Sequence, residues 1–409
     1  MKKHLVFFAV LLTIALSQAS RGETPTFKAQ FRMRAESSQR TDYSSIRDFM
    51  LLRIRPDITW KASDKLTLLL QPQFAKTLGA PVFVGSSTTA NTSQTTSGAT
   101  FDTELGVHQA YLNYQPSEDV QFRLGRQILS YGDELILGAL EWNNVGRSFD
   151  GAKARFSFSP HWVDLFYSKL SENNSTTSGP GDNDFAGIYS HFNLNQWLEE
   201  VQLYFFYLRN QSTGTLSELF SVGLRLHANV SNVDYRIEGT KQFGSATTTA
   251  GTAYQLDGEV GYTLTNLSKL RLAAGGFLAG ATYNQMFPTA HKWLGIADVL
   301  GRRNLAGFEA NASVVPLPDF KIGASYHLFV RADSSASAFK LNGATALGAA
   351  GGSASNAIGS ELDVTLSYVL DEKLNLAGGA GFFFAGQYVT DQLGSVGPTF
   401  FFLQAASQL

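Results

Sequence analysis

Cysteine is absent from the chain. This absence excludes disulfides, thiolate metal sites and cysteine nucleophiles, and it suits a protein that crosses an oxidising periplasm. Long apolar runs are missing after the first segment, and the mean hydropathy is -0.07, so we do not expect a helical membrane protein. Neither sign of charge is in excess, because the formal net charge is -2. A nucleic-acid partner is therefore not expected.

Residues 1–19 have the organisation of an export signal. They combine a basic start at 1–4, an apolar run over 5–16 and small residues flanking a cleavage point at Ala19. We expect removal of residues 1–19, which leaves residues 20–409 as a single domain. A short N-terminal membrane anchor is the alternative, although the apolar run is shorter than a spanning helix needs.

Beyond residue 24, apolar and polar residues alternate in about eighteen stretches of about ten residues each. Successive side chains of a strand point to opposite faces, so each stretch has one apolar and one polar face. In one stretch near the C-terminus, Leu362, Val364, Leu366 and Tyr368 oppose Glu361, Asp363, Thr365 and Ser367. A soluble β-sandwich shows the same alternation with its apolar face inward, so the pattern leaves two folds open.

The lengths of the connectors favour a membrane barrel over a sandwich. Short turns such as 61–64 and 115–118 alternate with longer segments, which are 78–101, 130–147, 171–183, 281–304 and 331–358. Short periplasmic turns opposite long external loops are typical of outer-membrane barrels, and closure leaves no unpaired strand edge in lipid. We predict an all-β fold, a transmembrane antiparallel β-barrel of about 18 strands with a lumen open to water. We expect the segments rich in Ser, Thr, Gly and Ala, 86–100 and 334–360, to lie at the surface, with inward folding of one as the alternative.

Inward-facing charges are the candidate functional residues of such a channel, because a channel selects through the groups that line it. Strand parity predicts a basic wall on the early strands, made of Arg32, Arg34, Arg53, Arg55, Arg123, Lys153 and Arg155. Later strands contribute Arg236 among carboxylates that include Asp257, Glu309 and Asp363. Local pairing between neighbouring strands is the alternative interpretation of each charge. Clustered arginines are less easily explained in that way, because like charges repel unless an anion passes.

Enzymatic readings receive little support from the sequence. Neighbouring carboxylates such as Asp257 and Glu259 imitate a glycosidase pair, but barrel strands commonly carry such neighbours for solvation. The seven histidines lack ligand spacing, and neither a Ser-His-Asp arrangement nor a G-x-S-x-G motif occurs. We therefore expect no catalytic residue, no metal and no cofactor.

Two blocks carry a family resemblance, residues 124–133 (LGRQILSYGD) and 141–152 (EWNNVGRSFDGA). Together with residues 287–295 (FPTAHKWLG) and the C-terminal hairpin, they resemble the alginate export porin family of the Gram-negative outer membrane. The resemblance implies an eighteen-stranded barrel that passes an anionic polysaccharide attracted by luminal arginines. Four residues of the two blocks, Arg126, Asp133, Arg147 and Asp150, either bind substrate at the external mouth or anchor the intervening loop, and we favour anchoring.

The sequence hypothesis is thus an outer-membrane channel for passive transport of an anionic polysaccharide or oligosaccharide such as alginate. A general or small-anion nutrient porin is one alternative, and a barrel whose external loops bind a glycan or another partner is a second. The expected partners are outer-membrane lipid, the anionic saccharide and periplasmic export components.

Overall fold

The computed structural model describes residues 24–39, 47–78, 103–172, 181–211, 215–247, 250–394 and 396–409. The expected export signal, residues 1–19, and the expected surface segment 86–100 lie outside these ranges. The strands are β1 (Thr26–Gln39), β2 (Arg47–Ser63), β3 (Leu66–Thr77), β4 (Thr103–Ser117), β5 (Val120–Gln127), β6 (Phe149–Phe158), β7 (His161–Ser171), β8 (Asn183–Phe192), β9 (Glu200–Asn210), β10 (Ser217–Val230), β11 (Val233–Phe243), β12 (Tyr254–Leu264), β13 (Leu270–Ala279), β14 (Leu305–Leu317), β15 (Phe320–Val330), β16 (Ala357–Asp371), β17 (Leu374–Ala385) and β18 (Thr399–Gln408). Short helical segments are η3 (Ala250–Thr252), η4 (Ala290–Lys292) and α2 (Gln387–Leu393).

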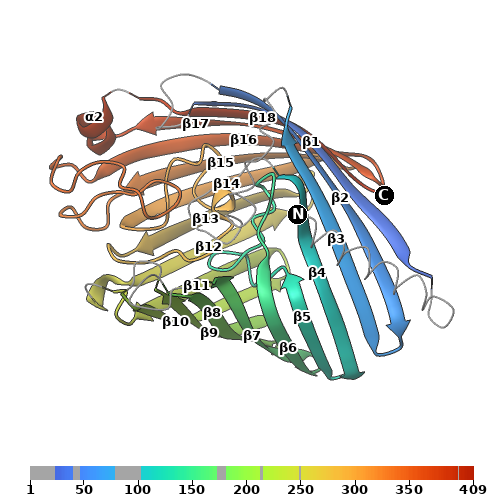
Figure 1. Cartoon of the computed structure of the whole chain (residues 1–409). Coiled ribbons are helices and arrows are strands. Elements are labelled where there is room, and N and C mark those ends of the chain that lie inside the picture. The colour runs from blue at the N-terminus through green and yellow to red at the C-terminus, as the bar shows by residue number, and fades with distance from the viewer. Residues whose placement is uncertain are drawn as a thin grey trace.

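All 18 strands form one antiparallel sheet in which each strand pairs with its sequence neighbours (Figure 1). The sheet closes because β1 also pairs with β18, from Gln30 opposite Gln408 to Gln39 opposite Thr399. Among the strands that the structure describes, this closure leaves no edge unpaired, which is the requirement that hydrocarbon imposes on a sheet. The predicted barrel is therefore confirmed.

Between its rims, the outward face of the barrel is mainly apolar and the inward face is mainly polar and charged. On β16, Leu362 and Leu366 are 39% and 43% exposed, whereas Glu361 and Asp363 are 0% and 3% exposed. In a β-sandwich the leucines would be buried and the carboxylates exposed, because the apolar faces of its two sheets pack against each other. The outward leucines fit lipid, and the alternation of the sequence sets this orientation on each strand.

Tight turns and long loops lie at opposite ends of the barrel. Pairs of strands are joined by turns as short as residues 64–65, 118–119 and 318–319, whereas the loops at the other rim include 128–148 and 280–304. By the usual orientation of such barrels, the short turns face the periplasm and the long loops face the exterior. No helix among the described residues is long and apolar enough to cross a membrane.

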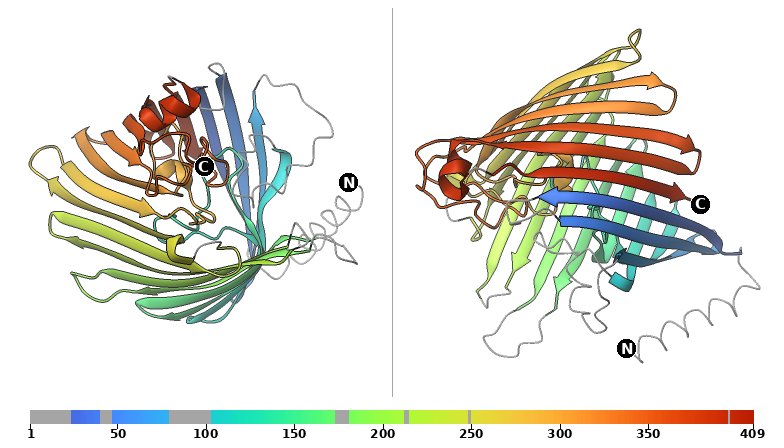
Figure 2. Two further views of the ribbon diagram at one scale, coloured as in Figure 1. Left: turned by 90° about the vertical axis from the view of Figure 1, so that its left-hand side faces the viewer. Right: turned by 90° about the horizontal axis from the view of Figure 1, so that it is seen from above.

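Two long loops fold into the barrel and narrow the lumen. We call residues 128–148, between β5 and β6, inner loop A, and residues 280–304, between β13 and β14, inner loop B. Viewed from the end that carries α2, segments of both loops cross the space within the ring of strands (Figure 2). The interior thus contains folded chain as well as charged wall.

Apolar side chains of inner loop A explain its inward position. Ile136 and Leu137 are buried in a hydrophobic cluster with the inward-facing Phe166, Phe185 and Phe206 of β7, β8 and β9. Removing these side chains from water stabilises the folded loop, at about 25 cal/mol per Å² of apolar surface. Leu135, Ile136 and Leu137 were visible in the sequence as apolar residues within a segment that we had described only as a long connector.

The segment 334–360, expected at the surface, is also partly buried. Ala338 and Leu347 are 0% and 1% exposed and belong to a second hydrophobic cluster that includes Tyr388 of α2 and Leu294 of inner loop B. The hydroxyl of Tyr388 accepts a hydrogen bond from the backbone N–H of Ala338 at 3.2 Å. Loop 331–356 and α2 therefore support the inner loops from the external side.

Candidate functional site

Inner loops A and B pair with each other inside the barrel. The backbone N–H of Gly138 donates to the carbonyl of Phe287 at 2.9 Å, and the N–H of Phe287 donates to the carbonyl of Ile136 at 2.9 Å. A third bond runs from the N–H of Thr289 to the carbonyl of Glu134 at 3.0 Å. The two loops thus form one connected constriction rather than two independent segments.

Arg147 joins the loops at their point of contact. Its Nη1 donates to the carbonyls of Gly138 at 3.0 Å and Pro288 at 3.1 Å, and also to the carbonyl of Phe287. The side chain is only 2% exposed, and buried carbonyls need donors because an unpaired one is costly. A single guanidinium therefore supplies donors to both inner loops.

The predicted basic wall on β1 and β2 faces inward but is covered by inner loop A. Arg32, Arg34, Arg53 and Arg55 are 7%, 2%, 7% and 1% exposed. Their guanidinium groups donate to carbonyls of the loop: Arg32 to Glu141 at 2.7 Å, Arg34 to Trp142 at 2.8 Å, Arg53 to Glu141 at 3.1 Å and Arg55 to Val145 at 2.9 Å. The arrangement differs from the open attractive wall that strand parity suggested, because a loop occupies the space in front of it.

Glu141 supplies the negative charge that these arginines share. Its carboxylate contacts Nη1 of Arg55 at 2.7 Å and Nη2 of Arg53 at 3.0 Å, and Nε2 of His108 lies 3.4 Å away. Burial acts to raise the pKa of Glu141, but Arg55, His108 and Arg53 outweigh it and hold the pKa well below its usual value. Glu141 was not among the residues that we had selected from the sequence, although it begins the second motif block.

Trp142 connects the basic wall with inner loop B. The guanidinium carbon of Arg34 lies 3.9 Å from the centre of its ring, and the ring of His291 is stacked at 3.8 Å between centroids. Cation–π and stacking contacts of this kind add to the area that the ring buries. Trp142 thereby ties β1 to both inner loops.

Asp133 of inner loop A contacts a different part of the barrel wall. Its carboxylate receives Nε and Nη2 of Arg225, on β10, at 2.8 and 2.7 Å. Its backbone carbonyl accepts a hydrogen bond from Nζ of Lys292 at 3.0 Å. Inner loop A is therefore held at β1 and β2 on one side and at β10 on the other.

The other two motif residues lie apart from the constriction. Arg126 of β5 and Asp150 of β6 are register partners, and their side chains form an ion pair at 2.7 Å. By alternation they share the face of Leu124 and Ala152, which points away from the lumen. The four motif residues thus divide into two in the inner loops and two on the outer wall at the long-loop rim.

Arg123, Lys153 and Arg155 face the lumen on β5 and β6, nearer the periplasmic turns. Lys153 and Arg155 both contact Asp164, at 3.2 and 2.6 Å, and Arg155 lies over the ring of Trp162 at 4.1 Å. Arg123 contacts the uncharged Asn113 at 3.4 Å and lies 4.2 Å from the ring centre of Tyr111. The structure therefore brings these three predicted cations together and separates them from the four under inner loop A.

Inner loop B is held by the carboxylates of the later strands. Backbone N–H groups of Ile296 and Ala297 donate to Asp363 at 3.3 Å and Glu361 at 2.7 Å. Arg302 is 4% exposed and contacts Asp257 at 2.7 Å. The basic wall thus holds carbonyl groups of one loop, and the acidic wall holds N–H groups and an arginine of the other.

A lumenal cavity of about 250 Å³ lies between inner loop B and strands β11 to β16. Arg236 lines it and contacts Asp257 and, at 3.0 Å, Glu309. The charged side chains around the cavity are Asp133, Glu259, Glu309 and Asp363 against Arg236 and Lys292. Among the described residues no group of three or more His, Asp or Glu side chains is arranged to hold a metal ion.

Gly295 shows how closely inner loop B fits the acidic wall. Its φ is +85°, and a Cβ atom there would fall 2.3 Å from the carboxyl group of Glu361.

The substitution Gly295→Ala tests this close fit. We expect it to lower the temperature at which the barrel unfolds, measured from the change in electrophoretic mobility after heating. Gly351→Ala is the matched control, because Gly351 also has a positive φ, +69°, but open space around it. Equal effects of the two variants would contradict the close fit.

The chain resembles known proteins in sequence pattern and in fold. A family model described as alginate export matches residues 25–402. Solved structures similar in fold include Pseudomonas aeruginosa OpdO (TM-score 0.62, 11% identity, 94% of this chain and 97% of that chain). Others are P. aeruginosa OccK8, also called OprE (0.61, 10%, 94% and 98%), and Acinetobacter baumannii OccAB4 (0.61, 10%, 95% and 99%). No curated protein sequence matches significantly. At these identities the solved structures show the shared fold alone.

Proposed function

The chain belongs to the alginate export family, and from this membership we propose that it is a channel for passive transport of an anionic polysaccharide or oligosaccharide such as alginate. The closed barrel and the family match together support the Gram-negative outer membrane as its location. A channel of this kind needs no covalent chemistry, because the solute moves down its own gradient. Under the same proposal, residues 1–19 direct export, the solute selectivity is anionic, and periplasmic export components deliver the solute.

The observation that supports the proposal best is the cluster of Arg123, Lys153 and Arg155. Two of these cations share the single carboxylate of Asp164, whose hydrogen-bond partners also include the hydroxyl of Tyr131 at 2.8 Å. One carboxylate balances only one of the three positive charges, so this part of the wall attracts anions. The four arginines under inner loop A, by contrast, contribute to the constriction that narrows the path.

Block of single-channel current tests the proposal. We expect uronate oligomers to interrupt the current through the purified channel in planar bilayers more strongly than neutral oligosaccharides of equal length. Arg123→Gln should weaken the uronate block about tenfold, because a hydrogen bond to a charged group contributes about 1.5–3 kcal/mol. Arg123→Lys, which keeps the charge, should retain most of the block.

Two results would contradict the proposal. Equal block by uronates and neutral sugars would show that the channel does not select anions. A barrel that conducts no current but still binds glycan would favour the hypothesis of binding by external loops. The same recordings thus separate the channel from the alternative in which the lumen is closed.

A less selective porin is the second candidate function, and the lumenal cavity favours it. Four carboxylates and two cations line that cavity, so its field is negative. If solute passes on this side of the constriction, the reversal potential in a salt gradient should indicate a preference for cations. A preference for anions would instead favour the path beside Arg123.

A further inference from the structure

A row of charges runs around the outside of the barrel at the long-loop rim. It contains one residue from each strand from β5 to β10, with alternating sign, and we call it the rim row: Arg126, Asp150, Lys169, Asp184, Arg209 and Glu218. Each member is the register partner of the next across the adjacent strands. Because alternate residues share a face, these side chains lie on the outward face with the apolar residues that precede or follow them by two.

Contacts within the rim row place two cations beside one carboxylate. Asp184 contacts Nζ of Lys169 at 2.7 Å and Nη1 of Arg209 at 3.2 Å. Lys169 also contacts Asp182 at 2.8 Å, and Arg209 donates to Gln211 at 2.9 Å. The side chains of Lys169 and Arg209 remain 31% and 35% exposed, so both cations are accessible from outside the barrel.

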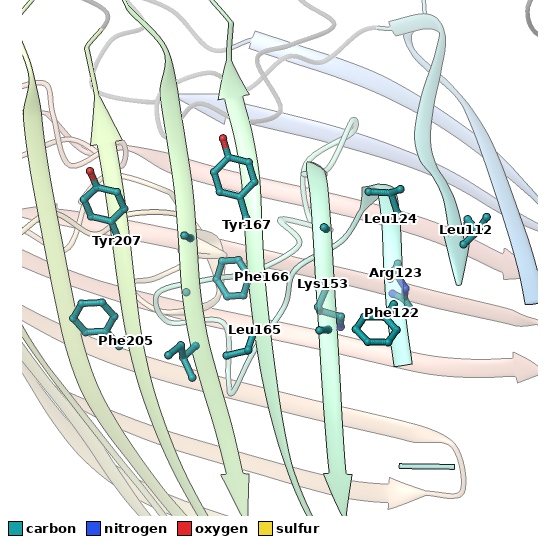
Figure 3. A pocket seen from close by; sticks show the side chains of 15 residues that line it. Leu112, Phe122, Arg123, Leu124, Lys153, Leu165, Phe166, Tyr167, Phe205 and Tyr207 are labelled. Carbon is teal, nitrogen blue, oxygen red and sulfur yellow. The ribbon is translucent and has the colours of Figure 1, made fainter. Parts of the chain in front are cut away.

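An apolar groove of about 720 Å³ lies on the same outer face (Figure 3). It adjoins the rim row, because its lining residues Leu124, Tyr167 and Tyr207 precede Arg126, Lys169 and Arg209 by two positions. Its size is within the range of about 300–1,000 Å³ that ligand pockets occupy. Ala152 and Ala154 on β6 and Ala186 on β8 leave room between larger side chains of β5, β7 and β9. The larger side chains are Phe122, Leu124, Leu165, Tyr167, Phe205 and Tyr207.

Two tyrosines connect the groove with the rim row. The rings of Tyr167 and Tyr207 line the groove, and their hydroxyl groups point toward the same end of the strands (Figure 3). The hydroxyl of Tyr167 donates to Asp184 at 2.6 Å, and that of Tyr207 donates to Glu218 at 2.7 Å. Tyrosine in this arrangement, with an apolar ring and a polar tip, is typical of the interface between hydrocarbon and lipid headgroups.

We propose that the groove and the rim row together bind a lipid of the outer leaflet that carries a phosphorylated headgroup. Its acyl chains lie on the alanines of β6 and β8, and its phosphates contact Lys169 and Arg209. The long-loop rim faces the exterior, so the lipid comes from the outer leaflet. The phosphates contact the exposed sides of Lys169 and Arg209, while Asp184 keeps its bonds to both cations and to the hydroxyl of Tyr167.

The spacing of the cations indicates a headgroup with two phosphates. Arg126, Lys169 and Arg209 stand on every second strand, and neighbouring strands are about 4.8 Å apart, so adjacent cations of the row are separated by about 10 Å. One phosphate reaches one such position, whereas a diphosphorylated headgroup reaches two. Diphosphoryl lipid A is therefore the probe of choice.

Native mass spectrometry of the full chain in detergent tests this proposal. We expect diphosphoryl lipid A to remain bound to the wild type, and dephosphorylated lipid A to be retained at least about tenfold less, because charge-assisted bonds are lost. The double variant Lys169→Gln, Arg209→Gln should reduce retention of diphosphoryl lipid A by a similar factor. Lys241→Gln is the matched control, because Lys241 is an outward-facing cation of β11 outside the rim row.

Filling the groove tests the apolar part separately. Ala154→Phe with Ala186→Phe should lower retention of the lipid, whereas Ala274→Phe, at an exposed outward position of β13, should not. Unchanged retention in the groove variants or in the cation variants would overturn the proposal, and so would a stable dimer with no bound lipid. Conductance does not depend on this outer surface, so loss of lipid with normal uronate block leaves the proposed channel function intact.

Discussion

Replacement of Glu141 by alanine is expected to release inner loop A from the basic wall and to raise the single-channel conductance. The change leaves Arg53 and Arg55, which are 7% and 1% exposed, without their shared carboxylate. The Glu141 side chain itself is 42% exposed, so the loss is the cost of leaving two buried donors poorly paired, about 1–3 kcal/mol. The population of undocked loop should then rise about tenfold or more, since 1.4 kcal/mol is a factor of ten. Planar-bilayer recordings should show a larger and less steady current.

A double variant separates the ion pair from other effects of the substitution. Arg55→Met with Glu141→Leu removes both charges, and apolar replacements of buried pairs are often neutral or stabilising, so part of the wild-type conductance should return. Asp333→Asn is a control for loss of a loop charge, because the Asp333 side chain contacts Ser335 of its own loop. Wild-type conductance in Glu141→Ala would show that this contact does not hold the loop.

Replacement of Arg147 by methionine is expected to separate the two inner loops. The guanidinium donates to carbonyls of Gly138, Phe287 and Pro288, and methionine fills the space without donating. Each buried acceptor left unpaired costs about 1–3 kcal/mol, so loss of the donors to Gly138 and Pro288 costs about 2–6 kcal/mol, given that Phe287 keeps the N–H of Gly138. Protease added to the folded channel in detergent should cut within residues 128–148 or 280–304, whereas the wild type resists.

Two further variants give this experiment its comparison. Arg147→Lys keeps the charge, but its side chain is one bond shorter, so the ammonium falls short of the position from which Nη1 contacts all three carbonyls and an intermediate rate of cleavage is expected. Arg303→Met removes donors to Ala281 and Gly343 from a less buried arginine of inner loop B, and its effect should be smaller. If all three variants resist protease as the wild type does, Arg147 is not the link between the loops.

The placement of charges in this barrel follows one physical rule. Guanidinium groups of β1 and β2 donate to carbonyls of inner loop A, and carboxylates of β16 accept from N–H groups of inner loop B. Backbone polar groups of a loop removed from water require such partners. Two walls of opposite charge, separated by only β17 and β18, thus hold the donors of one loop and the acceptors of the other.

The sequence by itself determined the barrel and the direction in which each side chain faces. Alternation is a local property with period two, so Arg32 and Arg53 were assigned to the lumen without knowledge of any distant contact. The lengths of the connectors determined which end carries the long loops. The family blocks at 124–133 and 141–152 identified the segment that proved to contain the constriction.

Only the tertiary structure decided what lies in front of those inward charges. Whether a loop stays outside or folds inward depends on partners more than a hundred residues away, such as Phe287 for Arg147, and alternation carries no information about them. The same limit explains why the sequence did not separate Arg126 and Asp150, which pair on the outer wall, from the two motif residues in inner loop A. Closure of the sheet sets these distances, because it brings strands from both ends of the chain around the same interior.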